Sequence, residues 1–321
     1  MATSRARLDA PRPAHGERLD PRYVARRRGV ERDHEAQIFG RSRTGFNIEN
    51  ARLARAAIAW TVRLALMEGR GRRNAAAVVL REHRVARPRL PAAFDGLRVL
   101  QVSDLHADMS GPALGRTAEL AGGVAADLTV VTGDFRGPTA GPFDRALAEV
   151  ERLLPALPPP VYAVLGNHDS IDMVAPLEAM GVRCLVNEAV ALTRGDAVIH
   201  LAGVDDAHFY RMDNLDRALA DVPLGAFTLL LSHTPELWRQ AAHSDVDLML
   251  SGHTHGGQIC LPGGLPLFLS AKLPRGLGRG PWRHHDLVGY TSVGCGVSVV
   301  PVRFNCPPEI TLHVLERGGA Q

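Results

Sequence analysis

The chain has 321 residues, of which 45% are hydrophobic, and a formal net charge of +3. These values exclude an intrinsically disordered chain and are typical of a folded protein with one large domain and an extension, or with two domains. The charge is unevenly distributed, because residues 1–98 hold 22 Arg and 10 acidic residues whereas residues 99–321 hold 15 basic and 24 acidic residues. The basic N-terminal part therefore differs in its charge from the acidic remainder and is expected to have its own structural role.

The N-terminal region, residues 1–90, is predicted to be a basic, partly disordered extension. Residues 1–47 are rich in Arg, Pro and Gly with little apolar periodicity, so we expect weak order there. From Ile48 to Met67, apolar residues recur at helical spacing with arginines between them, which predicts an amphipathic helix too short to span a bilayer. This helix could lie on an anionic membrane surface or dock on the catalytic domain, and the sequence leaves both alternatives open.

Residues 91–321 are predicted to form the catalytic domain. Short apolar runs alternate with helical segments, which indicates an α/β fold with buried sheets. The run from Ala189 to Val204 contains a turn at Arg194-Gly195-Asp196 and predicts a hairpin, so the sheet should be mixed. The cysteines form no C-x-x-C pair and no secretory signal precedes them, so we expect reduced thiols in the cytoplasm. They are Cys184, Cys260, Cys295 and Cys306.

Five apolar runs share one feature, which is that each ends in side chains able to bind a metal or transfer a proton. Because ligands collect at the carboxyl ends of strands in open α/β sheets, we expect these side chains to meet. Carboxylates, imidazoles and one amide suit Mn, Fe or Zn. Each motif alone is compatible with a helix cap or a turn, but five in order predict a metal centre. The motifs are Asp104-Leu-His106, Gly133-Asp134, Asn167-His168-Asp169, Ser232-His233 and His253-Thr-His255.

In this order, the motifs resemble the full signature of the calcineurin-like metallophosphoesterases. The extended Gly252-His-Thr-His-Gly-Gly-Gln258, with Pro301-Val-Arg-Phe and Pro308-Glu-Ile, is similar to the bacterial branch that includes the YkuE and YaeI phosphodiesterases. The resemblance covers about residues 97–315. It implies a sandwich of two mixed β-sheets flanked by helices, two divalent metal ions, and a phosphoester or pyrophosphate substrate.

The resemblance also implies a role for each motif residue. A water between the two ions would attack phosphorus in line. His168 lies outside the metal coordination and would stabilise charge or protonate the leaving oxygen, with Asp169 orienting it. The family pattern assigns one metal ion to Asp104, His106 and His255, the other to Asn167, His233 and His253, and the bridging position to Asp134.

Three further residues are candidates for substrate binding. Arg136 follows the bridging Asp134 by two positions, and its guanidinium could hold a phosphate or could simply be a salt-bridged arginine. Asp206 and His208 lie in a segment of acidic and aromatic residues for which no core role is evident. That segment could form a wall beside the substrate, or its aromatic residues could simply pack.

These observations favour a metal-dependent hydrolase of phosphodiester or pyrophosphate bonds. An alternative is a UDP-2,3-diacylglucosamine pyrophosphohydrolase of lipid A synthesis, whose lipid-linked substrate a membrane-bound helix would suit. An alternative of another class is a non-catalytic scaffold, against which the intact His168 and seven metal positions argue. No specific nucleic acid partner is expected, because the catalytic part is acidic. We expect a cytoplasmic protein that, if the helix binds lipid, is peripheral on the inner face of the cell membrane.

Overall fold

The computed structural model describes residues 19–39, 60–61, 63–64 and 66–318. Within these ranges, no helix is long and apolar enough to cross a membrane. The helices are α1 (Pro21–Phe39), α3 (Glu68–Ala76), α4 (Gly111–Gly122), α5 (Asp144–Leu153), α6 (Val174–Ala179), α7 (Leu215–Ala218) and α8 (Trp238–Ala242). The strands are β1 (Val79–Arg87), β2 (Leu97–Val102), β3 (Leu128–Thr132), β4 (Val161–Val164), β5 (Val182–Cys184), β6 (Glu188–Arg194), β7 (Ala197–Gly203), β8 (Thr228–Leu231), β9 (Leu248–Ser251), β10 (Gly280–His284), β11 (Leu287–Thr291) and β12 (Glu309–Arg317).

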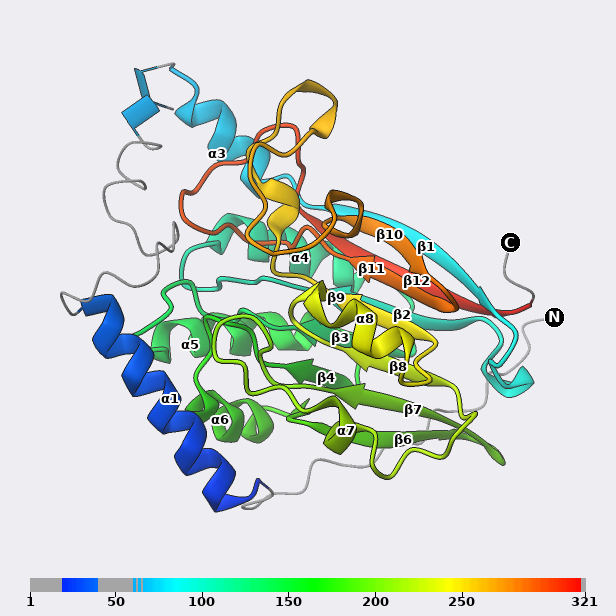
Figure 1. Cartoon of the computed structure of the whole chain (residues 1–321). Coiled ribbons are helices and arrows are strands. Elements are labelled where there is room, and N and C mark those ends of the chain that lie inside the picture. The colour runs from blue at the N-terminus through cyan, green and yellow to red at the C-terminus, as the bar shows by residue number, and fades with distance from the viewer. Residues whose placement is uncertain (1–18, 40–59, 62, 65, 319–321) are drawn as a thin grey trace.

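The strands form two six-stranded sheets (Figure 1), in the orders β1-β12-β2-β3-β4-β5 and β10-β11-β9-β8-β7-β6. Both sheets are mixed. In the first, β2 to β5 are parallel and β12 is antiparallel to β2. In the second, β7, β8, β9 and β11 are parallel, and the predicted hairpin is the antiparallel pair β6–β7. The predicted sandwich of two mixed sheets is confirmed.

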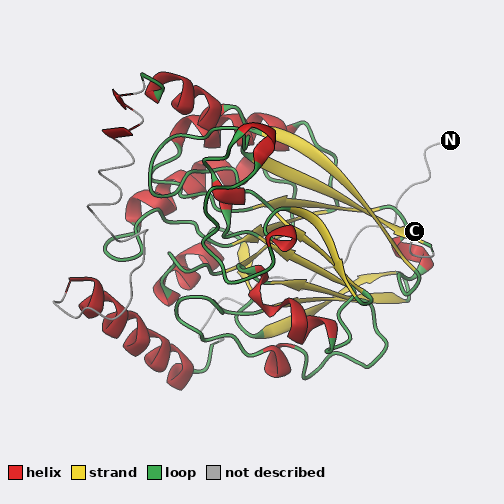
Figure 2. Ribbon diagram, turned by 45° about the horizontal axis from the view of Figure 1, so that its top comes forward, coloured by secondary structure: helices red, strands yellow, loops and turns green. Residues whose placement is uncertain are grey.

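The two sheets pack face to face, and each is covered on its outer face by helices (Figure 2). In β2, Val99 packs between the sheets, whereas its neighbour Leu100 packs on the helix side. Successive residues of a strand point to opposite faces, so a strand buried on both faces needs an apolar run without alternation. Helices α4, α5 and α6 cover the first sheet, and α7 and α8 cover the second. The layers are therefore helix, sheet, sheet and helix.

The N-terminal region contributes to this sandwich. β1 pairs in parallel with β12 along its whole length, from Val79 to Arg87. The boundary predicted at residue 90 thus falls between β1 and β2, and the segment before it supplies the edge strand of the first sheet. The sequence from Ala75 to Val85 is compatible with a second short helix or with a strand that leads into the domain, and the structure shows a strand from Val79 onward.

Helix α1 lies where the sequence predicted weak order. Asp20 accepts a hydrogen bond from the Arg22 N–H (2.8 Å), and Pro21 occupies the first turn, where its missing N–H is harmless. Among the side chains of the helix that the structure describes, the buried ones are Tyr23 and Arg27, one turn apart. Tyr23 packs in the apolar core, but Arg27 beside it is charged, so a search for apolar periodicity could not detect this face. Residues 1–18 and 40–47 lie outside the described part of the chain.

The predicted amphipathic helix from Ile48 to Met67 also lies largely outside the described residues. Among those that are described, Trp60, Leu64 and Leu66 are exposed to solvent. The structure therefore shows no docking of these three side chains on the catalytic domain.

Candidate metal centre

The five predicted motifs converge at one edge of the sandwich, directly after the carboxyl ends of β2, β3, β4, β8 and β9. Two groups of buried ligand atoms result, and within each group the atoms lie within 4.8 Å of one another. The first group is Asp104, His106 and His255, and the second is Asp134, His233 and His253.

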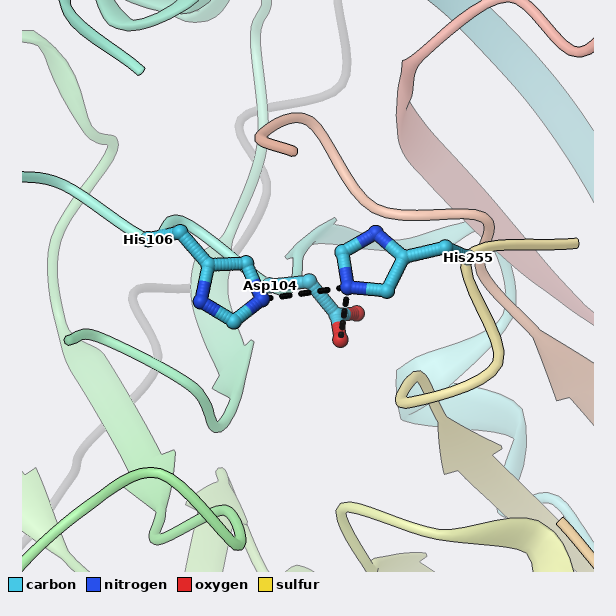
Figure 3. Close-up of side chains that lie close together, drawn as sticks. All are labelled: Asp104, His106 and His255. Carbon is cyan, nitrogen blue, oxygen red and sulfur yellow. Dashed lines mark hydrogen bonds and ion pairs between the residues drawn. The ribbon is translucent and has the colours of Figure 1, made fainter. Parts of the chain in front are cut away.

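The first group is shown in Figure 3. The Nε2 atoms of His106 and His255 are 3.0 Å apart, and His255 Nε2 lies 3.5 Å from Asp104 Oδ1. Both imidazoles face inward from opposite sides, and the carboxylate lies beside them. Such a set of two nitrogen atoms and an oxygen suits a first-row transition metal.

The carboxylate of the second group lies close to a histidine of the first. His233 Nε2 lies 3.3 Å from Asp134 Oδ2 and 2.9 Å from Asn167 Oδ1, so the amide oxygen that the sequence predicted as a ligand lies beside this group. The same Asp134 Oδ2 lies 3.6 Å from His106 Nε2, which belongs to the first group. Asp134 therefore occupies the position between the two groups that a bridging ligand would need.

Main-chain carbonyls set the orientation of three imidazoles. A carbonyl oxygen only accepts hydrogen bonds, so each Nδ1 that faces one must carry the proton, and Nε2 is then turned toward the centre. Carbonyl partners of this kind orient metal-binding histidines and fix their tautomer. The pairs are His106 with the Arg136 carbonyl (2.9 Å), His168 with that of Gly137 (2.5 Å) and His233 with that of Thr132 (2.8 Å).

The backbone is strained at these ligands. Five of them have positive φ values, in a region that non-glycine residues rarely adopt and that costs about 1–3 kcal/mol each. Neighbouring glycines provide the space, since a Cβ atom at Gly166 would collide with the Asp134 carboxylate and one at Gly252 with that of Asp104. The φ values are 52° at Asp104, 39° at His106, 58° at Asp134, 71° at His253 and 50° at His255.

The charges of the site also fit divalent cations. Burial raises the pKa of Asp104 to about 7, with a contribution from the nearby Asp134. Burial would lower the pKa of His233, but the carboxylate of Asp134 raises it to about 10. Burial, together with His106 and Arg303, holds the pKa of His255 well below its usual range, so this ring keeps the lone pairs that a ligand requires. Two buried carboxylates face imidazoles here, which is a donor set suited to bound cations.

Comparison with known proteins decides the family. A model described as calcineurin-like phosphoesterase matches residues 97–257. The chain belongs to the calcineurin-like phosphoesterase family. The resemblance seen in the sequence is thereby confirmed, and with it the prediction that the protein is a phosphoester hydrolase.

Three relatives illustrate the similarity. The uncharacterized metallophosphoesterase YkoQ of Bacillus subtilis is 31% identical over 227 residues, which are 68% of this chain and 83% of YkoQ. YkuE of the same organism is 29% identical over 244 residues, 73% of this chain and 84% of YkuE. A Bos taurus transmembrane protein with metallophosphoesterase domain is 32% identical over 254 residues, which are 71% of this chain but only 55% of the bovine protein.

In this phosphoesterase, Asp169 differs from its predicted role. Its carboxylate accepts hydrogen bonds from four main-chain N–H groups at 2.8–3.2 Å, whereas the His168 ring is oriented by the Gly137 carbonyl. Asp169 therefore joins the loop that carries Asp134 to the loop that carries His168, and it does not orient the ring directly. The donors are the amides of Asp134, Phe135, Arg136 and Gly166.

Arg136 is buried, and its guanidinium donates to main-chain carbonyls. Nε donates to the His168 carbonyl at 2.8 Å and Nη2 to that of Thr139 at 2.9 Å, while Nη1 donates to that of Gly141. These contacts favour a role in holding the His168 loop over the predicted role as a phosphate ligand.

Asp206 and His208 lie in the loop that follows β7. The buried Asp206 carboxylate accepts hydrogen bonds from the amides of residues 208–210, so it shapes its own loop. His208 is the member of the pair that approaches the metal site, because its ring centroid is 4.3 Å from that of His253. Its Nδ1 lies 2.8 Å from Glu236 Oε2, a partner that sequence reasoning missed.

The sequence also gave no indication of a role for two arginines near the metal centre. Arg303 is fully buried, and its Nη2 lies 3.2 Å from His255 Nδ1 while donating to the carbonyls of Val293 and Gly296 at 2.7 Å each. Its motif, Pro301-Val-Arg-Phe, was noted in the sequence without a role. Arg27 of α1 is fully buried too, and its Nη2 donates to the Asp169 carbonyl at 3.3 Å.

Arg27 joins the N-terminal helix to the catalytic domain. Its Nε forms an ion pair with Asp205 at 2.9 Å, its Nη1 pairs with Glu31 at 2.7 Å, and its guanidinium lies 3.6 Å from the centre of the Tyr210 ring. The Tyr23 hydroxyl donates to the same Asp205 carboxylate at 2.6 Å. Helix α1 is thus fastened to the loop that carries His208.

Arg27→Ala is expected to lower the free energy of unfolding by about 3–5 kcal/mol, because it leaves Asp205 buried without its cationic partner. Denaturant unfolding of the full chain measures this. Arg28→Ala is the matched control, since the Arg28–Asp172 pair is exposed and should contribute about 1 kcal/mol or less. Equal losses in the two variants would show that α1 is not held by the buried pair.

Proposed function

We propose that this chain hydrolyses phosphodiester or pyrophosphate bonds with two divalent metal ions, Mn, Fe or Zn. The observation that carries the proposal is the shared position of Asp134, whose Oδ2 lies near His106 of one ligand group and His233 of the other. Membership of the phosphoesterase family supports the reaction class. Two cations held by these ligand groups would supply the charge that acidifies a water and stabilises the phosphoryl oxygens.

His168 is proposed as the acid of the reaction. Its Nε2 lies 4.0 Å from Asp134 Oδ2, while Nδ1 is held on the Gly137 carbonyl. The ring therefore presents Nε2 to a substrate that lies over the shared carboxylate. In the protonated state this atom can donate to a phosphoryl oxygen or to the leaving oxygen.

Diesters or pyrophosphates are expected to be hydrolysed in preference to monoesters. A monoester approaches as a dianion and gains most from a pocket with many cationic donors, and the guanidinium of Arg136 is engaged by three carbonyls. We therefore expect kcat/KM to be higher for bis-p-nitrophenyl phosphate than for p-nitrophenyl phosphate, measured at equal metal loading and neutral pH. A tenfold preference for the monoester would make the enzyme a phosphatase.

We further propose a cytoplasmic location with peripheral contact to the membrane, and a lipid-linked substrate. All four cysteines are free and buried, which supports a reducing compartment. The exposed Trp60, Leu64 and Leu66 of the predicted amphipathic segment support the membrane contact. The Bos taurus relative is named as a transmembrane protein with metallophosphoesterase domain, which supports a site of action near lipid.

A further inference from the structure

A second apolar surface lies far along the chain from the N-terminal segment. Residues 261–268, called the apolar loop below, expose Leu261 (45%), Leu265 (51%), Leu267 (59%) and Phe268 (55%). Neighbouring large apolar side chains that face solvent together commonly mark an interaction site. The apolar loop plays no part in the metal centre, so its exposure calls for another explanation.

The apolar loop has a defined conformation. The Leu261 N–H donates to the Leu265 carbonyl at 2.9 Å, and the Gly264 N–H donates back to the Leu261 carbonyl at 3.0 Å. Arg279 Nη1 donates to the Gly264 carbonyl at 2.6 Å, and Cys260 bridges to Pro266 at the base. The exposed side chains are therefore presented outward by a structured loop.

The surroundings of the apolar loop are basic. The sequence from Gln258 to His285 contains no Asp or Glu. A structured apolar tip with cationic flanks has the chemistry of a surface that enters an anionic bilayer, where apolar side chains reach the acyl boundary and arginines face the phosphates. The basic residues of the segment are Lys272, Arg275, Arg279 and Arg283.

This basic and apolar surface continues onto α3. The Arg303 N–H donates to the Gly71 carbonyl at 3.0 Å, and the Asn74 side chain donates to the Arg303 carbonyl at 3.0 Å. The adjacent Phe304 carbonyl accepts the N–H of Cys260 at 2.9 Å, at the base of the apolar loop. Figure 1 shows α3 and the loop at the same end of the molecule. Helix α3 adds exposed basic side chains to this end at Arg70 and Arg73, whereas the exposed Arg72 pairs with Glu68 of the same helix at 2.9 Å.

The base of the apolar loop packs on the turn that follows His255. A Cβ atom placed on Gly257 would lie 2.8 Å from the Phe268 carbonyl oxygen and 2.5 Å from Pro266 Cβ. The loop is thus joined closely, in the chain and in space, to the segment that carries a candidate metal ligand.

We infer that the apolar loop inserts into the surface of an anionic lipid bilayer, with the arginines beside it and on α3 facing the lipid headgroups. The loop is then a membrane contact separate from the Ile48 to Met67 segment. The contact does not depend on the reaction catalysed. A consequence of this contact would be that the metal centre receives substrates whose phosphate lies at the level of the lipid headgroups. This consequence rests on the proposed function.

The first test is flotation of the metal-loaded full chain with vesicles of phosphatidylcholine and phosphatidylglycerol. Leu267→Asp/Phe268→Asp should raise the lipid concentration for half-maximal binding at least tenfold. The control is Leu224→Asp, which makes one such substitution at a side chain that is 95% exposed and precedes β8, at the opposite end of the strands from the metal site, and Phe268→Asp alone is compared with it at equal charge. Unchanged binding by the double variant, or equal binding to pure phosphatidylcholine, would overturn the inference.

Hydrolysis of soluble bis-p-nitrophenyl phosphate is measured on the same samples. Retained hydrolysis with lost flotation supports the membrane contact and shows that the fold is intact. A wild type that floats but hydrolyses nothing would contradict the proposed function and leave the lipid contact supported. The two proposals can therefore fail separately.

A second measurement does not depend on how well the charged variant folds. All four native cysteines are buried, so Leu267→Cys can be labelled selectively with an environment-sensitive fluorophore. Its emission should shift to the blue on addition of the anionic vesicles, whereas that of labelled Leu224→Cys should not. If the label at 267 keeps its aqueous emission while the protein floats, the bilayer contact lies elsewhere, and a protein partner becomes the better occupant of the loop.

Discussion

Asp134→Asn is expected to lower the occupancy of both metal sites and to reduce turnover by about 10³-fold or more. Asp134 Oδ2 lies between the two ligand groups, 3.6 Å from His106 Nε2 and 3.3 Å from His233 Nε2. Loss of its charge therefore weakens both sites, and a bound metal contributes several kcal/mol of transition-state stabilisation, each 1.36 kcal/mol being tenfold in rate. Asparagine keeps an oxygen that can accept the His168 N–H, which Asp134 Oδ1 now accepts at 2.9 Å.

The measurement is metal content per chain after loading with Mn or Zn, together with the rate on bis-p-nitrophenyl phosphate. The matched control is Asp172→Asn, the same chemical change at an exposed carboxylate whose partner is Arg28. We expect two ions in the wild type and in the control. Loss of one ion alone in Asp134→Asn would show that Asp134 serves a single site.

His168→Ala is expected to retain both metal ions while turnover falls by about 10²-fold or more, the usual scale for removing an acid or a charge-stabilising donor. The reason is geometric. The ring of His168 belongs to neither ligand group, and its Nδ1 is engaged with the Gly137 carbonyl, so Nε2 is the atom presented to the substrate.

Metal content and kcat are measured on the same preparation. His243→Ala, which removes an exposed histidine at the end of α8, is the control and should change neither quantity. Full activity in His168→Ala would remove this residue from the mechanism. Loss of metal along with activity would instead make it a ligand.

Much of the fold could be predicted because its determinants are local. β2 and β3 are predominantly apolar runs, since they are buried on both faces, and the Arg194-Gly195-Asp196 turn predicts the hairpin of β6 and β7. Asp104 and Asp134 directly follow such runs. This position predicts that they lie at one edge of the sheet, because the carboxyl ends of parallel strands meet there.

The N-terminal region could not be predicted in the same way. The described buried side chains of α1 are Tyr23 and Arg27, whose polar atoms find their partners, Asp205 and Asp169, far along the chain. A polar side chain can be buried when its hydrogen bonds are satisfied, and only the tertiary structure shows that they are. The sequence of β1 alone did not distinguish a helix from a strand, because the strand with which it pairs, β12, lies at the other end of the chain.

At the candidate metal centre, the sequence by itself determined which residues are candidate ligands and their order in the chain, since residue type and position after a strand are local properties. Only the tertiary structure decided how the groups around them are used. In the structure, the Asp169 carboxylate accepts hydrogen bonds from main-chain amides, and the Arg136 guanidinium donates to main-chain carbonyls. The His168 ring donates to the Gly137 carbonyl. Polar side chains of this kind have several possible partners, and the choice depends on which loops the fold brings within about 3 Å of one another.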